Sequence, residues 1–331
     1  MISVDNTLLK GYNFIDLFAG IGGFHYALSS YGAKCVFASE WDKYATETYQ
    51  ANFGITPYGD ITKINEKDIP AHDILCGGFP CQAFSISGKQ KGFEDTRGTL
   101  FFDIVRIANH HRPKIIFLEN VKNLIRHDNG NTFTVVTKTI ENLGYNVFYK
   151  VLNSSNFGLP QNRERVYIIC FRNDLNVLNF EFPAPSCTAV TLRSILESKP
   201  QAKIINRPDI QITKHYAPQY GLLSNEIELP NRPIQIGKVG KGGQGERIYD
   251  PIGHAITLSA YGGGVGSKTG LYLVDGVVRK LSTRECARCQ GFPDSFIINS
   301  CEQQAYKQFG NSVSINVLQL ILKQITKSIN G

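Results

Sequence analysis

The stretch CGGFPCQAFS contains two cysteines whose type and spacing could do chemistry. Cys76 ends the apolar run DILC, so we expect it to point into a sheet as a small hydrophobe. Cys81 follows two glycines and a proline that fixes its own backbone angle, which predicts a thiol just beyond the end of a strand. Cys81 is therefore the better candidate for a nucleophile.

A nucleophilic thiolate needs a cationic neighbourhood and a proton source within reach. Glu119, at the end of KIIFLEN, supplies a carboxyl group that could protonate a ring nitrogen. In QNRERVYIIC, Arg163 and Arg165 are two residues apart and so project from one face of a strand or its lead-in, where they could orient that carboxylate. An ordinary solvated edge is the alternative for this pair. The polar segment 82–98 is long for a loop and is typical of an active-site lid.

The motif DLFAGIGG, between a predicted strand and a predicted helix, is a glycine-rich turn of the nucleotide-binding kind. The spacing of Gly20, Gly22 and Gly23 does not match the dinucleotide fingerprint G-x-G-x-x-G. Glu40, at the end of the next predicted strand, could accept hydrogen bonds from both hydroxyls of a ribose.

Two further residues would complete a nucleoside site. Trp41, the only tryptophan, could stack on an adenine, with a place in the core as the alternative. Asp60, at the end of a third short predicted strand, could accept a hydrogen bond from an exocyclic amine. Glu40 and Asp60 could instead be helix caps. All three at successive strand ends favour a nucleoside site.

The elements that must position these residues alternate between strand and helix patterns. The periodicity predicts strands at 12–20, 33–40, 72–80, 114–120, 145–152 and 165–171, and helices at 22–32, 41–54, 99–111 and 131–143. This order predicts an α/β fold with a doubly wound, mostly parallel, Rossmann-like sheet. Such sheets bind ligands at the carboxyl ends of their strands.

The composition bounds the class of protein. A chain of 331 residues, 42% of them hydrophobic, can bury one large domain and a smaller one. The longest apolar runs are too short to cross a bilayer, so we expect no membrane association. The net charge of +7 is compatible with a polyanionic partner, although many enzymes are as basic. Cys286 and Cys289 form a CxxC, but without paired histidines or a second CxxC we expect no metal.

Six motifs in order resemble the DNA cytosine-5 methyltransferases over nearly the whole chain. They are DLFAGIGG, GFPCQAFSISGKQKGFEDTRG, ENV at 119–121, QNRER at 161–165, RECARCQGFPDSF and KQFGNSV. The resemblance implies methyl transfer from S-adenosyl-L-methionine to C5 of a cytosine flipped out of double-stranded DNA, leaving S-adenosyl-L-homocysteine. It implies that Cys81 attacks C6 while Glu119 protonates or hydrogen-bonds N3, with Arg163 and Arg165 holding the base and Glu119.

The same resemblance implies which residues contact the cofactor and the DNA. The cofactor site would comprise Phe18, Gly20, Gly22, Gly23, Glu40, Trp41, Asp60, Ile61, Pro80, Leu100 and Asn311. The lid would close over DNA with Ser85, Ser87 and Arg97. Gln244 would replace the flipped cytosine and pair with the orphaned guanine, with Thr257 on a phosphate. Arg247, Ser259 and Tyr261 would contact bases or backbone.

The segments 237–250 and 255–264 resemble those of family members that modify GCGC. We therefore expect methylation of the first cytosine of GCGC, a cognate GCGC restriction endonuclease as functional partner, a monomer, and a bacterial cytoplasmic location. The implied domains are a catalytic domain of residues 1–193 with 311–331, a β- and loop-rich target-recognition domain of 194–282, and a hinge of 283–310. The alternatives are an RNA cytosine-5 methyltransferase, an inactive DNA-binding relative and a nicotinamide-dependent oxidoreductase; the glycine spacing disfavours the last.

Overall fold

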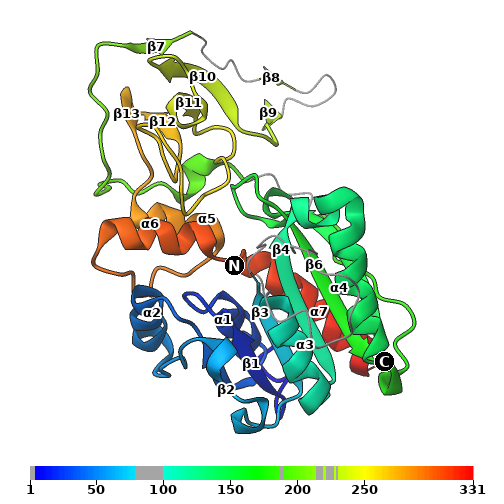
Figure 1. The fold of residues 1–331 in the computed structure, drawn as a ribbon. Coiled ribbons are helices and arrows are strands. Elements are labelled where there is room, and N and C mark those ends of the chain that lie inside the picture. Colours follow the sequence, from blue (N-terminus) through cyan, green and yellow to red (C-terminus); the bar gives the residue numbers. More distant parts are fainter. Residues whose placement is uncertain are drawn as a thin grey trace. The chain divides into compact units, whose positions relative to one another are not determined.

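The computed structural model describes residues 4–79, 100–185, 190–213, 219–220, 227–228 and 230–330. The chain divides into two compact units (Figure 1). The first comprises Met1–Leu152, Glu164–Pro183 and Leu318–Gly331, and the second comprises Asn153–Arg163 and Ala184–Val317. The segments 153–163 and 283–317 thus belong to the second unit.

The first unit is built on a six-stranded sheet. Its strands are β1 (Asn13–Leu17), β2 (Lys34–Ser39), β3 (Ile74–Gly78), β4 (Ile115–Val121), β5 (Tyr145–Asn153) and β6 (Glu164–Arg172), in the order β2-β1-β3-β4-β6-β5. The first four strands pair in parallel, and β6 pairs antiparallel to β4. The carboxyl ends of β1 to β4 and the amino end of β6 therefore share one edge of the sheet.

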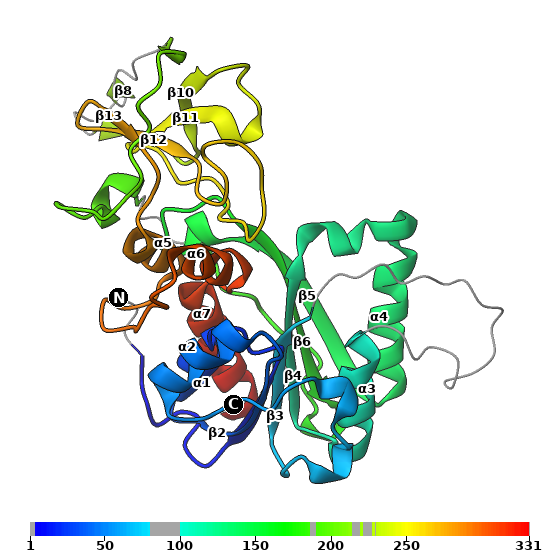
Figure 2. The same cartoon turned by 60° about the vertical axis from the view of Figure 1, so that its left-hand side comes forward.

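Helices cover both faces of this sheet, as Figure 2 shows, with α3 and α4 on one side and α1, α2 and α7 on the other. They are α1 (Gly23–Ser30), α2 (Lys43–Phe53), α3 (Leu100–His111), α4 (Asn131–Asn142) and α7 (Ile315–Asn330). Asp42 caps α2 by accepting hydrogen bonds from the amides of Tyr44 and Ala45, and Gly54 ends the helix in the left-handed region. The mostly parallel sheet flanked by helices is the doubly wound architecture that the sequence predicts.

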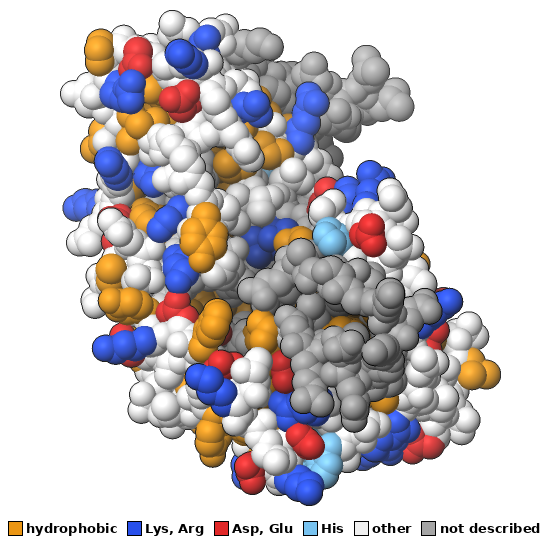
Figure 3. All heavy atoms as spheres, viewed as in Figure 1, with side chains coloured by type: hydrophobic (Ala, Val, Ile, Leu, Met, Phe, Trp, Pro, Cys, Tyr) orange, Lys and Arg blue, Asp and Glu red, His pale blue; other side chains and the backbone are white. Residues whose placement is uncertain are grey.

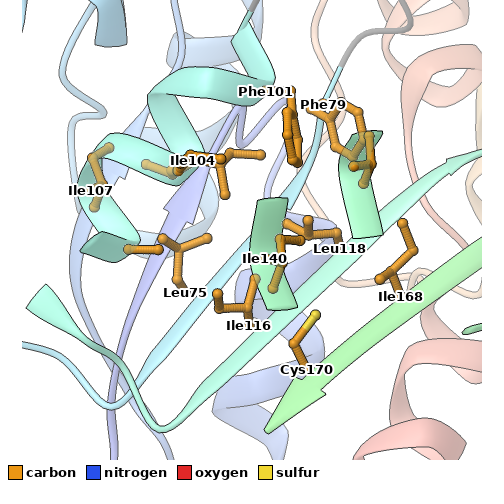
Figure 4. Packing of buried hydrophobic residues seen from close by; sticks show 14 of the residues in the cluster. Leu75, Phe79, Phe101, Ile104, Ile107, Ile116, Leu118, Ile140, Ile168 and Cys170 are labelled. Atoms are coloured by element: carbon orange, nitrogen blue, oxygen red, sulfur yellow. The ribbon is translucent and has the colours of Figure 1, made fainter. Parts of the chain in front are cut away.

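The main core lies between the sheet and the helices α3 and α4. Ile104 and Ile107 of α3 and Ile140 of α4 pack with Leu75 of β3 and Leu118 of β4 (Figure 4), and all five side chains are buried. The helix periodicity of 99–111 places Phe101, Ile104, Val105 and Ala108 on one buried face. This packing fixes β4, which contains Glu119 near its carboxyl end, and β3, which Cys81 follows in the sequence.

The second unit contains a five-stranded sheet over a smaller core. The strands β7 (Ile210–Ile212), β10 (Ile234–Val239), β11 (Arg247–Asp250), β12 (Leu271–Val274) and β13 (Val277–Arg279) lie in the order β13-β12-β11-β10-β7, and β8 (Gln219–Tyr220) pairs with β9 (Ile227–Glu228). The helices α5 (Thr283–Gln290) and α6 (Glu302–Asn311) also belong to this unit. At the start of α5, Ser282 and Glu285 form a capping box.

Short 3₁₀ turns connect many of these elements. They are η1 (Ile61–Lys63), η2 (Glu66–Asp68), η3 (Lys122–Ile125), η4 (His127–Gly130), η5 (Ser154–Phe157), η6 (Asn173–Leu175), η7 (Leu192–Ile195) and η8 (Gln244–Glu246). One expected strand is wrong: the segment ending at Asp60 makes a single isolated bridge, between Tyr58 and Ser39. Asp60 instead caps η1, so the helix-cap alternative describes its local role.

Candidate active site and recognition segments

The carboxyl ends of β1 and β2 form a turn suited to a nucleoside. After β1 the chain turns through Phe18, Gly20 and Gly22, which have φ of 55°, 56° and 84°. A left-handed φ at a bulky residue such as Phe18 is strained, and such strain gathers at ligand sites. At Gly22 an added Cβ would lie 2.1 Å from Cε2 of Phe53, so α2 packs directly on the turn.

Glu40 is held against this turn by two backbone amides. Its Oε2 accepts a hydrogen bond from the amide of Gly20 at 2.8 Å, and its Oε1 accepts one from the amide of Asp42 at 2.8 Å. Each carboxylate oxygen keeps a further lone pair, so the group can still accept hydrogen bonds from a diol. Burial raises the pKa of Glu40, and the amide hydrogen bonds of Asp42 and Gly20 oppose the shift.

The neighbours of Glu40 fit the adenine end of such a ligand. The Trp41 side chain is 74% exposed, which rules out a place in the core. Asp60 follows Tyr58, whose amide donates to the carbonyl of Ala38 in β2. Oδ1 of Asp60 accepts hydrogen bonds from the amide of Thr62 at 3.0 Å and from the hydroxyl of Thr62 at 2.8 Å. These hydrogen bonds lower the pKa of Asp60. These three residues therefore fit an adenosine. Trp41 supplies an exposed indole, Asp60 an ionised carboxyl group and Glu40 a partly buried one.

We expect Glu40→Ala to raise the Kd for S-adenosylmethionine at least about tenfold, because the ribose hydroxyls lose their charged acceptor. Affinity for DNA should change much less. In the wild type, cofactor affinity should also fall as the pH drops, because the raised pKa of Glu40 makes its carboxylate take up a proton at a higher pH than an ordinary glutamate does. Calorimetric titration measures both effects. Glu47→Ala, on the exposed side of α2, is the control, and an unchanged Kd for Glu40→Ala would remove Glu40 from the site.

Glu119 and Arg165 meet at the same edge of the sheet. In the antiparallel pair of β4 and β6, Glu119 lies opposite Tyr167, so Arg165 is its diagonal neighbour on the same face. The Nε of Arg165 lies 3.1 Å from Oε1 of Glu119, and Glu119 is only 7% exposed. The sequence predicted that Arg163 and Arg165 together would orient this carboxylate, and the structure brings Arg165 to it. A cation beside a nearly buried carboxyl group suits proton donation or hydrogen bonding to a ring nitrogen.

The two cysteines of the opening motif are separated by their surroundings. Cys76 is fully buried in β3 and its Sγ donates a hydrogen bond to the carbonyl of Ile15 at 3.2 Å, which confirms that it points into the sheet. Burial raises the pKa of this thiol well above its usual value, which disfavours the reactive thiolate. Cys81 and Pro80 lie outside the described residues, as do Ser85, Ser87 and Arg97 of the expected lid.

Arg163 has different partners from Arg165. Strand β6 begins at Glu164, so Arg163 precedes the strand and belongs to the second unit. It is 2% exposed, and its guanidinium donates hydrogen bonds to the carbonyls of Leu258, Gly310 and Ser312. Sequence reasoning missed this contact, since the three carbonyls are far along the chain and carry no side-chain signal.

The residues expected to contact DNA lie in two loops of the second unit. Gln244 begins η8 and Arg247 begins β11, and both are exposed. Thr257 donates its hydroxyl proton to the carbonyl of Asn162 at 2.6 Å, and Ser259 donates to the carbonyl of Tyr261 at 2.6 Å. The Tyr261 ring is 74% exposed. Among the expected cofactor residues, Ile61 is buried, while Asn311 is exposed at the end of α6.

The two loops touch each other at Gly245. The carbonyl of Gly245 accepts a hydrogen bond from the amide of Gly266 at 2.7 Å, and a Cβ added at Gly245 would lie 1.9 Å from the carbonyl oxygen of Gly263. The second loop thus sets the position of the first, directly beside Gln244. The sequence alone does not predict this contact.

We expect Gly245→Ala to force the two loops apart and to lower the preference for the cognate site at least about tenfold, because the residue beside Gln244 is displaced. Gly263→Ala is the matched control, since its Cβ would have no atom within 4 Å. Competitive methylation of cognate and single-mismatch duplexes measures the preference. Equal preferences in both variants would show that this contact has no part in recognition.

The two cysteines of the CxxC motif lie in helix α5. Cys286 and Cys289 are buried in α5, burial raises the pKa of both thiols, and no cluster of His, Cys, Asp and Glu suited to a metal occurs among the described residues. In the part of the chain that the structure describes, no helix has the length and apolarity to span a membrane. Figure 3 shows Lys and Arg side chains scattered over the described part of the visible face with no single large patch, so charge alone does not mark a DNA-binding surface on this face.

The fold and the residues at this sheet edge define a class of enzyme. Residues 12–327 match the family model described as C-5 cytosine-specific DNA methylase. The chain belongs to this family and is a DNA (cytosine-5) methyltransferase.

Individual relatives support this membership. The chain is 56% identical to the type II methyltransferase M.HhaI of Haemophilus parahaemolyticus, covering 100% of this chain and 99% of the relative. It is 44% identical to the type II methyltransferase M.HpaII of Haemophilus parainfluenzae, over 98% and 92% of the two chains. The fold resembles that of the Dnmt2 methyltransferase of S. pombe, with a TM-score of 0.71, 20% identity, and coverage of 97% and 100%.

Proposed function

We propose that this methyltransferase modifies the first cytosine of GCGC in double-stranded DNA and protects that DNA from a cognate restriction endonuclease. The type II methyltransferases among its relatives support a place in a restriction-modification system. The resemblance of segments 237–250 and 255–264 to those of GCGC-modifying enzymes supports the site. The ion pair between Glu119 and Arg165, at the edge where β3 leads to Cys81, is the observation that carries the chemistry.

The proposed reaction begins with the thiolate of Cys81 forming a bond to C6 of a cytosine that has left the duplex. Glu119 donates its proton to N3, and Arg165 stabilises the carboxylate that remains. The electron density gained at C5 would then form a bond to the methyl carbon of the co-substrate while the bond between that carbon and the sulfonium sulfur breaks, leaving S-adenosyl-L-homocysteine. A base, for which we propose water, removes the proton from C5, the S–C6 bond breaks, and Cys81 leaves as thiolate while N3 returns its proton to Glu119.

S-adenosylmethionine, when bound, supplies the electrophilic methyl group. We propose that Glu40 binds the ribose of this cofactor and that Trp41 and Asp60 bind its adenine. Because Gly20 has no side chain, we propose that the cofactor contacts the Gly20 backbone directly. The remaining proposed cofactor residues are Phe18, Gly22, Gly23, Ile61, Pro80, Leu100 and Asn311.

The proposed division of labour follows the two units. The first carries the chemistry, and the second carries the proposed DNA contacts of Gln244, Arg247, Thr257, Ser259 and Tyr261. The lid residues Ser85, Ser87 and Arg97 are proposed to close over DNA. Because a reader of one strand can treat each half of a palindrome separately, we propose that the enzyme acts as a monomer, in the bacterial cytoplasm.

Base-resolution methylation mapping tests this function. Mixed-sequence duplex DNA is incubated with the purified protein and S-adenosylmethionine, and every 5-methylcytosine is located. Modification confined to the first cytosine of GCGC is the expected result. Modification at another sequence would keep the chemistry and reject the site. A folded protein that modifies RNA, or nothing, would overturn the proposal.

A further inference from the structure

Arg163 is a buried arginine at the end of the segment 153–163 of the second unit. Its Nη1 donates to the carbonyls of Leu258 at 3.1 Å and Gly310 at 3.3 Å, and its Nη2 donates to those of Gly310 at 3.3 Å and Ser312 at 2.6 Å. The planar fork of a guanidinium suits several carbonyls at once. One side chain therefore holds two separate loops, around Leu258 and around Gly310 to Ser312.

The first of these loops carries proposed DNA contacts and is bound to the same segment at several points. The amide of Asn162 donates to the carbonyl of Ala255 at 2.9 Å, and the amide of Leu258 donates to Oε1 of Gln161 at 2.9 Å. The hydroxyl of Thr257 donates to the carbonyl of Asn162. Residues 161–163 thus hold the loop by hydrogen bonds at several points along its length. Arg163 binds the loop at Leu258, next to Ser259.

The second loop, Gly310 to Ser312, carries a proposed cofactor contact and packs against the first loop. A Cβ added at Gly310 would lie 2.2 Å from the carbonyl carbon of Ser259 and 2.3 Å from the amide nitrogen of Ala260. The two carbonyls of this loop that Arg163 binds, of Gly310 and Ser312, flank Asn311. A single buried cation thus fixes the spacing between Ser259, on the proposed DNA side, and Asn311, on the proposed cofactor side.

We propose that Arg163 is a positioning residue for recognition: it locks the 257–261 loop to the Gly310–Ser312 turn, so that the DNA contacts and Asn311 keep one fixed spacing. This inference rests on the proposed function, and it assigns Arg163 a role other than the contact with the flipped base that the family resemblance implies. Arg163→Lys keeps the charge but not the fork, so a lysine ammonium cannot bridge the same carbonyls in one plane.

The test compares three conservative variants of the full-length enzyme in steady-state methylation of a cognate duplex. Arg163→Lys should raise the KM for DNA at least about tenfold, the size expected when hydrogen bonds to a charged donor are lost. It should also raise the KM for S-adenosylmethionine and lower the preference for the cognate duplex over a single-mismatch duplex, with kcat changed less than about threefold. Arg165→Lys should do the opposite, lowering kcat with little change in either KM.

Arg284→Lys is the matched control. Arg284 also donates to backbone carbonyls of the second unit, those of Pro293 at 3.2 Å and Phe296 at 2.8 Å, but it holds neither loop. An Arg284→Lys variant with the same rise in KM would reduce the effect of Arg163 to general loosening and overturn the proposal. So would a fall in kcat for Arg163→Lys with KM and site preference unchanged, since this is the result for a residue on the reacting base.

A second variant guards against misfolding. If Arg163→Lys does not fold, as judged by its thermal melting, Gly310→Ala pushes the same loops apart without removing a charge, and it should give the same rise in both KM values. Normal KM values and site preference in Gly310→Ala would overturn the proposal. A failure of the proposed function is visible separately, because it would appear in the wild-type enzyme as a different methylated sequence or as no methylation.

Discussion

Cys81→Ser is expected to lower methyl transfer by about 10⁴-fold or more while specific DNA binding is largely kept. A serine hydroxyl is a far weaker nucleophile toward C6 than a thiolate, and the loss of a covalent nucleophile has effects of this order. Binding should persist because Glu119, Arg165 and the recognition loops do not depend on the thiol. Transfer of tritium from labelled S-adenosylmethionine measures activity, and a gel mobility shift on a cognate duplex measures binding.

Cys76→Ala is the control for this variant, since the buried Cys76 thiol is proposed to take no part in the reaction. It should retain methyl transfer, with a modest loss of thermal stability from the missing Sγ and its hydrogen bond to Ile15. If Cys81→Ser lost DNA binding to the same extent as activity, Cys81 would be needed for folding or for the DNA surface, and the covalent mechanism would lose its support.

Glu119→Gln is expected to lower kcat by about 10² to 10⁴-fold, the range for loss of a general acid. The amide keeps the shape of the side chain but cannot donate a proton in the same way, and it leaves Arg165 without the carboxylate it pairs with at 3.1 Å. DNA and cofactor binding should change much less than kcat. Single-turnover methylation with enzyme in excess measures the chemical step directly.

Glu164→Gln provides the comparison on the adjacent strand position. Glu164 is an exposed carboxylate paired with Lys122 at 2.9 Å, and exposed pairs of this kind contribute little. Its rate should stay within about twofold of the wild type. A Glu119→Gln enzyme with an unchanged single-turnover rate would exclude Glu119 as the proton source.

The first unit was largely predictable because the patterns that define it are local. The run 115–118 is uniformly apolar before Glu119, and the structure has β4 at Ile115–Val121 with all but its last residue buried. The helix predicted at 131–143 is α4, Asn131–Asn142. The expected strand ending at Asp60 failed because a strand needs a neighbour, and Tyr58 makes only one bridge before Asp60 turns the chain into η1.

The candidate site was predictable only in part, since its decisive contacts are not local. Side-chain alternation predicts a common face for Arg163 and Arg165, but β6 begins at Glu164 and the rule does not reach Arg163. The pairing of Arg165 with Glu119 required the register of β4 and β6. The contact of Gly245 with Gly263 joins two loops through their backbones, so no side chain in the sequence marks it.

The interleaving of the two units along the chain limits how such an enzyme can acquire a new target. Residues 153–163 leave the first unit, join the second, and return at Glu164. Exchanging a gene segment that encodes 184–317 alone would therefore separate Arg163 from the Leu258, Gly310 and Ser312 carbonyls that it binds. A chimaera that exchanges target preference should work best when the short segment 153–163 is exchanged together with 184–317. Exchanging both segments requires two crossovers more than exchanging 184–317 alone.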